Sequence, residues 1–113
     1  MRGLAYVSLY ADDLQASRRF YGDLLGLPVV DEGDWGLVLR AGPVDVFVHS
    51  RGDAPTQHVE MTFDVRDVDA AIDTLRAAGV PVVDEPADRE WGDRDGAVAD
   101  PDGNVVYLRT QKA

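Results

Sequence analysis

Side chains that could bind or react with a small molecule recur at alternating positions in two short segments of the chain. The sets are Tyr6, Ser8 and Tyr10 in the first segment, and Glu60, Thr62 and Asp64 in the second. Apolar residues fill the positions between them, and side chains at alternate positions of a strand share one face. Each segment therefore predicts a strand with one apolar and one polar face. We expect the polar faces to line a ligand site, although a half-exposed sheet would show the same pattern.

Several chemical roles are open for Glu60. It could act as a fixed counter-charge for an organic cation, or as the general base of a metal-free enzyme if aromatic rings shield it from water. Glu60 also lies two residues from His58, so a displaced metal site that includes His49 is a further possibility. Surface exposure at strand ends is the alternative explanation for the two histidines.

The longest polar stretch, residues 84–95, is predicted to be a loop that contains Trp91. As part of a mobile loop, the Trp91 ring could fold over the ligand site as a lid and stack on the ligand. Packing of the ring at the Trp-Gly turn is the alternative.

Composition excludes several classes of function. The chain has 113 residues and no cysteine, which rules out disulfides, thiolate nucleophiles and thiolate metal sites. Its net charge of −10 argues against binding to nucleic acid or to an anionic membrane surface. The acidity fits either solubility or the attraction of cationic small molecules. No segment resembles a signal peptide or approaches the ~20 apolar residues of a membrane span, so we expect a cytoplasmic protein.

One six-residue sequence motif occurs twice and indicates that the chain consists of two modules. Gly26-Leu27-Pro28-Val29-Val30-Asp31 returns as Gly79-Val80-Pro81-Val82-Val83-Asp84. Two copies are too few for a solenoid, which needs about three or more repeats. The repeat instead predicts two similar modules, about 1–52 and about 56–113, within a single domain of 113 residues. A ligand site is expected between them.

Both modules follow the same predicted order of elements, strand-helix-strand-strand-strand. Asp13 and Asp67 are expected to cap the two helices, which end at Gly26 and Gly79. Alternating apolar residues and turn signals predict the strands. These are 5–11, 28–31, 35–40 and 44–49 in the first module, and 59–65, 81–84, 95–100 and 104–109 in the second. The fold class is therefore α+β.

The chain resembles the vicinal oxygen chelate superfamily, which includes glyoxalase I, extradiol dioxygenases and bleomycin resistance proteins. The matching segments run from residue 7 to 14 with Phe20-Tyr21, from 25 to 28, from 63 to 68, from 75 to 80, and Trp91-Gly92 before 100–104. The resemblance implies two tandem β-α-β-β-β modules that form a curled, cleft-bearing mixed sheet. It also implies a homodimer.

Enzymes of this superfamily hold a divalent metal ion with histidine and glutamate side chains, and the resemblance assigns the corresponding positions here. They are Tyr6, Glu60, Tyr107 and Phe47, or Val46 if the match slips by one residue. Only Glu60 is a good ligand, and one carboxylate does not hold a catalytic metal. We therefore predict no metal ion and no cofactor.

The aromatic replacements favour a planar or cationic organic ligand. Ring faces at Tyr6, Phe47 and Tyr107 beside Glu60 would hold it through stacking and cation–π contacts worth roughly 0.5–2 kcal/mol each. The chain then resembles metal-free, drug-sequestering members of the family, and antibiotic sequestration is the leading hypothesis. The alternatives are an isomerase, cyclase or lyase in which Tyr6 or Tyr107 stabilises charge on a substrate oxygen, and a cleft collapsed around its own rings.

Overall fold

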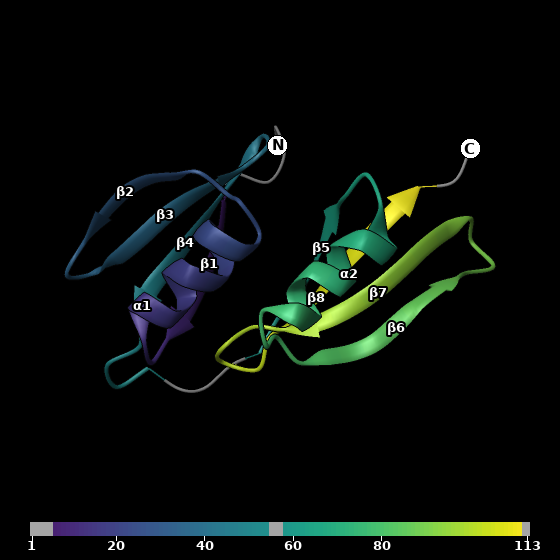
Figure 1. Ribbon diagram of the computed structural model, residues 1–113. Helices are drawn as coiled ribbons and strands as arrows, with labels where there is room; N and C mark the ends of the chain where they lie inside the picture. The colour runs from purple at the N-terminus through teal and green to yellow at the C-terminus, as the bar shows by residue number, and fades with distance from the viewer. Residues whose placement is uncertain (1–5, 55–57, 112–113) are drawn as a thin grey trace. The chain divides into compact units, whose positions relative to one another are not determined.

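The chain forms two compact units, residues 1–57 and 58–113, each with one sheet and one helical segment (Figure 1). The computed structural model describes residues 6–54 and 58–111. Ala5, predicted as the first strand residue, lies outside these ranges, as does the predicted module boundary at residue 56.

The first unit has the predicted order of elements. They are β1 (Tyr6–Ala11), α1 (Leu14–Ser17), the π-helical η1 (Arg18–Leu24), β2 (Val29–Gly33), β3 (Gly36–Ala41) and β4 (Val44–Ser50). The sheet order is β1-β4-β3-β2, with β1 parallel to β4 and the other pairs antiparallel. A parallel pair requires a crossover connection, and the helix supplies part of it.

The helical segment of the first unit is less regular than the single amphipathic helix that the sequence predicts. Asp13 caps its first turn as expected, because its Oδ1 accepts hydrogen bonds from the amides of Gln15 at 3.0 Å and Ala16 at 3.1 Å. From residue 18 onward the turns widen to π-helix. The wider turn accompanies the burial of two adjacent rings, Phe20 and Tyr21, which meet edge to face at 4.8 Å.

The second unit repeats this topology with a regular helix. Its elements are β5 (Glu60–Asp64), α2 (Val68–Ala77), β6 (Val82–Asp88), β7 (Asp93–Ala99) and β8 (Val105–Gln111). The sheet order is β5-β8-β7-β6, with β5 parallel to β8. The buried residues of α2 are Val68, Ile72 and Leu75, which place the helix against one face of the sheet (Figure 1). The prediction of two similar α+β modules is confirmed.

The prediction of a long polar loop over residues 84–95 is wrong. Strand β6 continues to Asp88 and β7 begins at Asp93, so that only a tight turn remains between them. The edge position of β6 tolerates Pro86, which lies at an irregularity in the pairing between Asp84 and Ala87. Opposite this irregularity stands Gly96, where a β-carbon would come within 3.1 Å of the Asp84 carbonyl oxygen. Residues 84–95 therefore form most of a β-hairpin, although their polar composition is typical of a loop.

In the described part of the chain, no helix is both long enough and apolar enough to cross a membrane.

Candidate functional site

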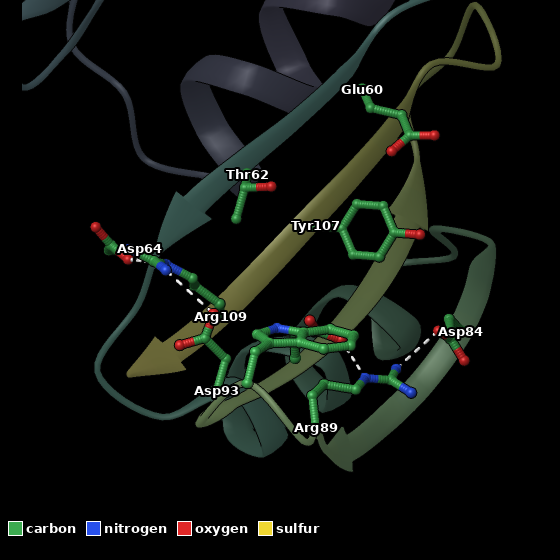
Figure 2. A pocket seen from close by; sticks show the side chains of 10 residues that line it. Glu60, Thr62, Asp64, Asp84, Arg89, Asp93, Tyr107 and Arg109 are labelled. Atoms are coloured by element: carbon green, nitrogen blue, oxygen red, sulfur yellow. Dashed lines mark hydrogen bonds and ion pairs between the residues drawn. The ribbon is translucent and has the colours of Figure 1, made fainter. Parts of the chain in front are cut away.

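A cavity of about 560 Å³ lies in the second unit (Figure 2). Its walls belong to the face of the sheet that α2 does not cover, and to the turn between β6 and β7. The residues that line it are Glu60, Thr62, Asp64, Asp84, Arg89, Trp91, Asp93, Asp95, Tyr107 and Arg109. The cavity is therefore formed by one unit alone.

Strand pairing explains why these residues meet. Two rows of paired residues cross the sheet from β5 through β8 and β7 to β6. The first row is Thr62, Tyr107, Ala97 and Asp84, and the second is Asp64, Arg109, Asp95 and Ala87. Alternate residues on each strand point to the same side, so both rows contribute to the cavity side of the sheet. Ala97, which stands between Tyr107 and Asp84 in the first row, is fully buried.

The second row contains a two-fold ion pair at Arg109. The Arg109 Nε donates to Asp64 Oδ1 at 2.6 Å, and its Nη1 donates to Asp93 Oδ2 at 3.1 Å (Figure 2). These hydrogen bonds, first that to Asp64 and then that to Asp93, raise the pKa of Arg109 above its usual value. Arg109 thus stays charged and is shared between two carboxylates.

Arg89 forms a similar arrangement at the base of the β6–β7 turn. Its Nε donates to Asp95 Oδ1 at 2.8 Å, and its Nη2 donates to Asp84 Oδ2 at 2.8 Å. The hydrogen bond that Arg89 donates to Asp95 is the main cause of the raised pKa of Arg89. Asp95 is only 9% exposed, and a carboxylate this buried requires a partner. Arg89 therefore closes the hairpin next to Trp91.

The cavity has an excess of negative charge. Five carboxylates line it, against the two guanidinium groups of Arg89 and Arg109. Four of the carboxylates share these arginines. Glu60 is exposed, and within residues 58–111 its side chain has neither a hydrogen bond nor an ion pair. A cavity of this composition attracts cations and repels anions.

The uncovered face of the first unit is aromatic instead. Tyr6 packs on Phe47 with ring centroids 4.8 Å apart, and Tyr10 stacks on His49 at 5.3 Å. The Phe47 and His49 rings are 6.0 Å apart, and Trp35 lies 6.5 Å from Phe47. We call these five residues the aromatic face. Tyr6, Tyr10 and Trp35 are all exposed despite their size.

Comparisons with known proteins agree with this architecture. The family model described as the glyoxalase/bleomycin resistance protein/dioxygenase superfamily matches residues 3–108. The chain belongs to this superfamily.

Solved structures of the superfamily share its fold. A glyoxalase-related enzyme from Fulvimarina pelagi is 24% identical with a TM-score of 0.85, over 98% of this chain and 89% of that protein. The lactoylglutathione lyase from Agrobacterium tumefaciens is 24% identical with a TM-score of 0.82, over 97% and 94% of the two chains. A superfamily member from Sphaerobacter thermophilus is 21% identical with a TM-score of 0.83, over 98% of each. At these identities the likeness establishes the fold alone. A search of functionally curated proteins finds no match.

Strand register determines which residue takes the uncertain superfamily metal position. Phe47 pairs with Ser8 in the first unit as Tyr107 pairs with Thr62 in the second. Val46 is 2% exposed and belongs to the helix-covered side. The position is therefore Phe47.

The side chains at the four superfamily metal positions do not fit a metal ion. They offer two phenols, at Tyr6 and Tyr107, the hydrocarbon ring of Phe47, and the carboxylate of Glu60. Histidine and carboxylate donors, which first-row metals require, are reduced to one. Among residues 6–54 and 58–111, no group of three or more histidine, aspartate or glutamate side chains is placed to hold a metal ion. His49 belongs to the first unit, whereas His58 and Glu60 belong to the second.

The structure sorts the predicted ligand residues into two sets. Glu60, Thr62, Asp64, Trp91 and Tyr107 line one cavity. Tyr6, Ser8, Tyr10 and Phe47 lie on the uncovered side of the first sheet. Contact of either set with a ligand stays a prediction.

Sequence reasoning missed the charged residues that complete the cavity. These are Asp84, Arg89, Asp93, Asp95 and Arg109. A usable signal existed for one of them, because Arg109 follows Tyr107 at the alternating spacing of a strand. Trp35 and His49 were likewise not predicted as members of the aromatic face.

Proposed function

We propose that the chain binds an organic cation with a planar or quaternary group in the cavity of the second unit, without a metal ion. The observation that supports this most strongly is the charge distribution of the cavity. Its two arginines are each shared by two aspartates, and Glu60 remains as an exposed carboxylate near the Tyr107 ring (Figure 2). A cation over a tyrosine or tryptophan face gains roughly 0.5–2 kcal/mol, and Tyr107 and Trp91 supply such faces.

The biological role that we propose is sequestration of a cationic antibiotic in the cytoplasm. The superfamily description includes bleomycin resistance proteins, and sequestration requires affinity but no reaction. The alternative is a metal-free isomerase, cyclase or lyase with Glu60 as general base. Such a base works best when shielded from water, whereas within its own unit Glu60 is exposed. We therefore favour a binding protein.

The test is titration calorimetry at neutral pH with two matched flat compounds. Ethidium is a permanent cation, and phenanthridine is its uncharged parent ring system. We expect ethidium to bind saturably and phenanthridine to bind at least about tenfold more weakly, because the parent ring system lacks the charge. Equal affinity for the two would contradict the proposal.

The Glu60→Gln variant locates the site. It should weaken ethidium binding by about tenfold, since it removes the exposed carboxylate while keeping the shape of the side chain. Glu90→Gln is the matched control, because Glu90 is exposed in the β6–β7 turn and does not line the cavity. An enzyme would instead convert a substrate, and Glu60→Gln would stop turnover while binding persisted.

The assembly state is a separate part of the proposal. We propose a homodimer, as the superfamily resemblance implies, with a small molecule as ligand and neither nucleic acid nor membrane as partner. Light scattering on the eluting protein measures its mass directly. A mass of twice 12.3 kDa is expected, and the monomer mass would refute the dimer without affecting the cavity.

A further inference from the structure

The excess negative charge of the cavity lies in separate places. Glu60 stands at the start of β5, and Asp64 at its end. Asp64 and Asp93 share Arg109, so this trio retains one net negative charge. Asp84 and Asp95 likewise share Arg89, and this group also retains one net negative charge. The trio and Glu60 lie at opposite ends of β5, and we call them the two acidic ends.

Strand geometry sets the distance between these ends and what lies between them. Asp64 is the fourth residue after Glu60 along β5, and four steps at the usual rise per residue correspond to about 13 Å. The residue midway is Thr62, whose partner in the adjacent strand is Tyr107. In Figure 2, Thr62 lies between Glu60 and Asp64, and the Tyr107 ring lies beside this line on the neighbouring strand β8.

From this arrangement we propose that the cavity is built for an elongated dication. One charge lies at Glu60, the other at the Asp64–Arg109–Asp93 trio, and the apolar middle of the ligand rests on the Tyr107 ring. This inference rests on the proposed function, because it specifies the ligand of the same cavity.

The trio can accept a cation without losing its own ion pair. The Asp64 side chain is 76% exposed, whereas that of Asp93 is 13% exposed. A ligand ammonium group can therefore reach Asp64 from solvent while Arg109 keeps its hydrogen bond to Asp93. A ligand with one charge leaves one of the two acidic ends without a partner. The cavity should therefore bind a dication more tightly than a monocation of the same length.

The experiment compares decamethonium with decyltrimethylammonium by titration calorimetry on the full chain. Both carry a ten-carbon chain and a trimethylammonium group, but only decamethonium has a second charge at the far end. We expect decamethonium to bind one to one and about tenfold more tightly. Shorter bis-trimethylammonium compounds, with chains of four or six carbons, should lose this advantage because they cannot reach both ends.

Matched variants test whether the second charge of the ligand binds at Asp64. Asp64→Asn should reduce the advantage of decamethonium over decyltrimethylammonium to less than about twofold. Asp73→Asn is the control, because Asp73 is also paired with an arginine and has a side chain 73% exposed, but lies outside the cavity. Thermal unfolding of both variants confirms that they are folded.

Four results would overturn the inference. Decamethonium does not bind, or it binds no more tightly than decyltrimethylammonium. The affinity of the bis-trimethylammonium compounds does not depend on their chain length, or Asp64→Asn and Asp73→Asn lose the same affinity for decamethonium. If ethidium binding still depends on Glu60, the proposed function survives and only the dication fails. If ethidium binding does not depend on Glu60, the proposed function itself fails.

Discussion

The two units have the same topology but opposite chemistry on their uncovered faces. In each, the first strand runs parallel to the last, and residues of the first strand alternate between the helix side and the open side. The open side of the first unit holds stacked rings, whereas that of the second holds arginine–aspartate pairs. Ser8–Phe47 and Thr62–Tyr107 match in register, so at these positions the two open sides differ in their side chains.

This comparison shows which positions the fold constrains. The helix-covered sides are apolar in both units, with Leu39, Val46 and Val48 buried in one and Val98, Val106 and Leu108 in the other. Burial of apolar area stabilises the fold, so these positions tolerate few residue types. The open sides are not packed against a helix, so their side chains can differ between the two units.

The largest expected effects come from the covered sides and should be similar in the two units. Leu39→Ala and Leu108→Ala each remove a fully packed side chain, and each should lower the free energy of unfolding by about 2–5 kcal/mol. Chemical denaturation measures both. As a control, Val30→Ala affects an exposed residue and should change stability little. A loss in one unit only would contradict the claim that both covered sides are equally essential.

Open-face aromatic residues should affect binding rather than stability. Tyr107→Leu should weaken ethidium binding by about three- to tenfold, because it removes one cation–π contact while keeping an apolar side chain. Tyr6→Leu is the comparison in the first unit, and we expect it to leave the ethidium affinity within about twofold, because Tyr6 does not line the cavity. Calorimetric titration of both variants with ethidium shows which substitution lowers the affinity more. If Tyr6→Leu has the larger effect, the aromatic face is the principal site.

The fold could be predicted from the sequence because its signals are local. The Asp13 cap and the alternation in β5 depend on residues close together in the chain. The ion pairs of the cavity could not be predicted in this way, since Arg109 and Asp64 are 45 residues apart and meet only through the pairing of β5 with β8. The strand predicted at 81–84 was too short, because Pro86 and its acidic neighbours are typical of loops, and the continuation of β6 to Asp88 is accommodated by its edge position.

The smallest expected effect concerns acid stability of the second unit. Two hydrogen bonds from Arg94, at 2.7 and 2.8 Å, lower the pKa of Asp69 below its ordinary value of 3.8. A lowered folded-state pKa adds stability that is present above 3.8 and disappears as the pH falls through the folded-state value. Asp69→Asn should therefore reduce stability slightly at neutral pH and make it less sensitive to acid. Thermal unfolding between neutral and acidic pH measures this, and an unchanged acid sensitivity would refute it.

The most direct test of metal-free cation binding is an ethidium titration of the protein before and after treatment with a chelator, with the metal content determined by elemental analysis. We predict saturable binding to a protein that contains no stoichiometric metal, with the same affinity after chelation and an about tenfold weaker affinity in Glu60→Gln. A stoichiometric metal ion whose removal abolishes ethidium binding would contradict the account.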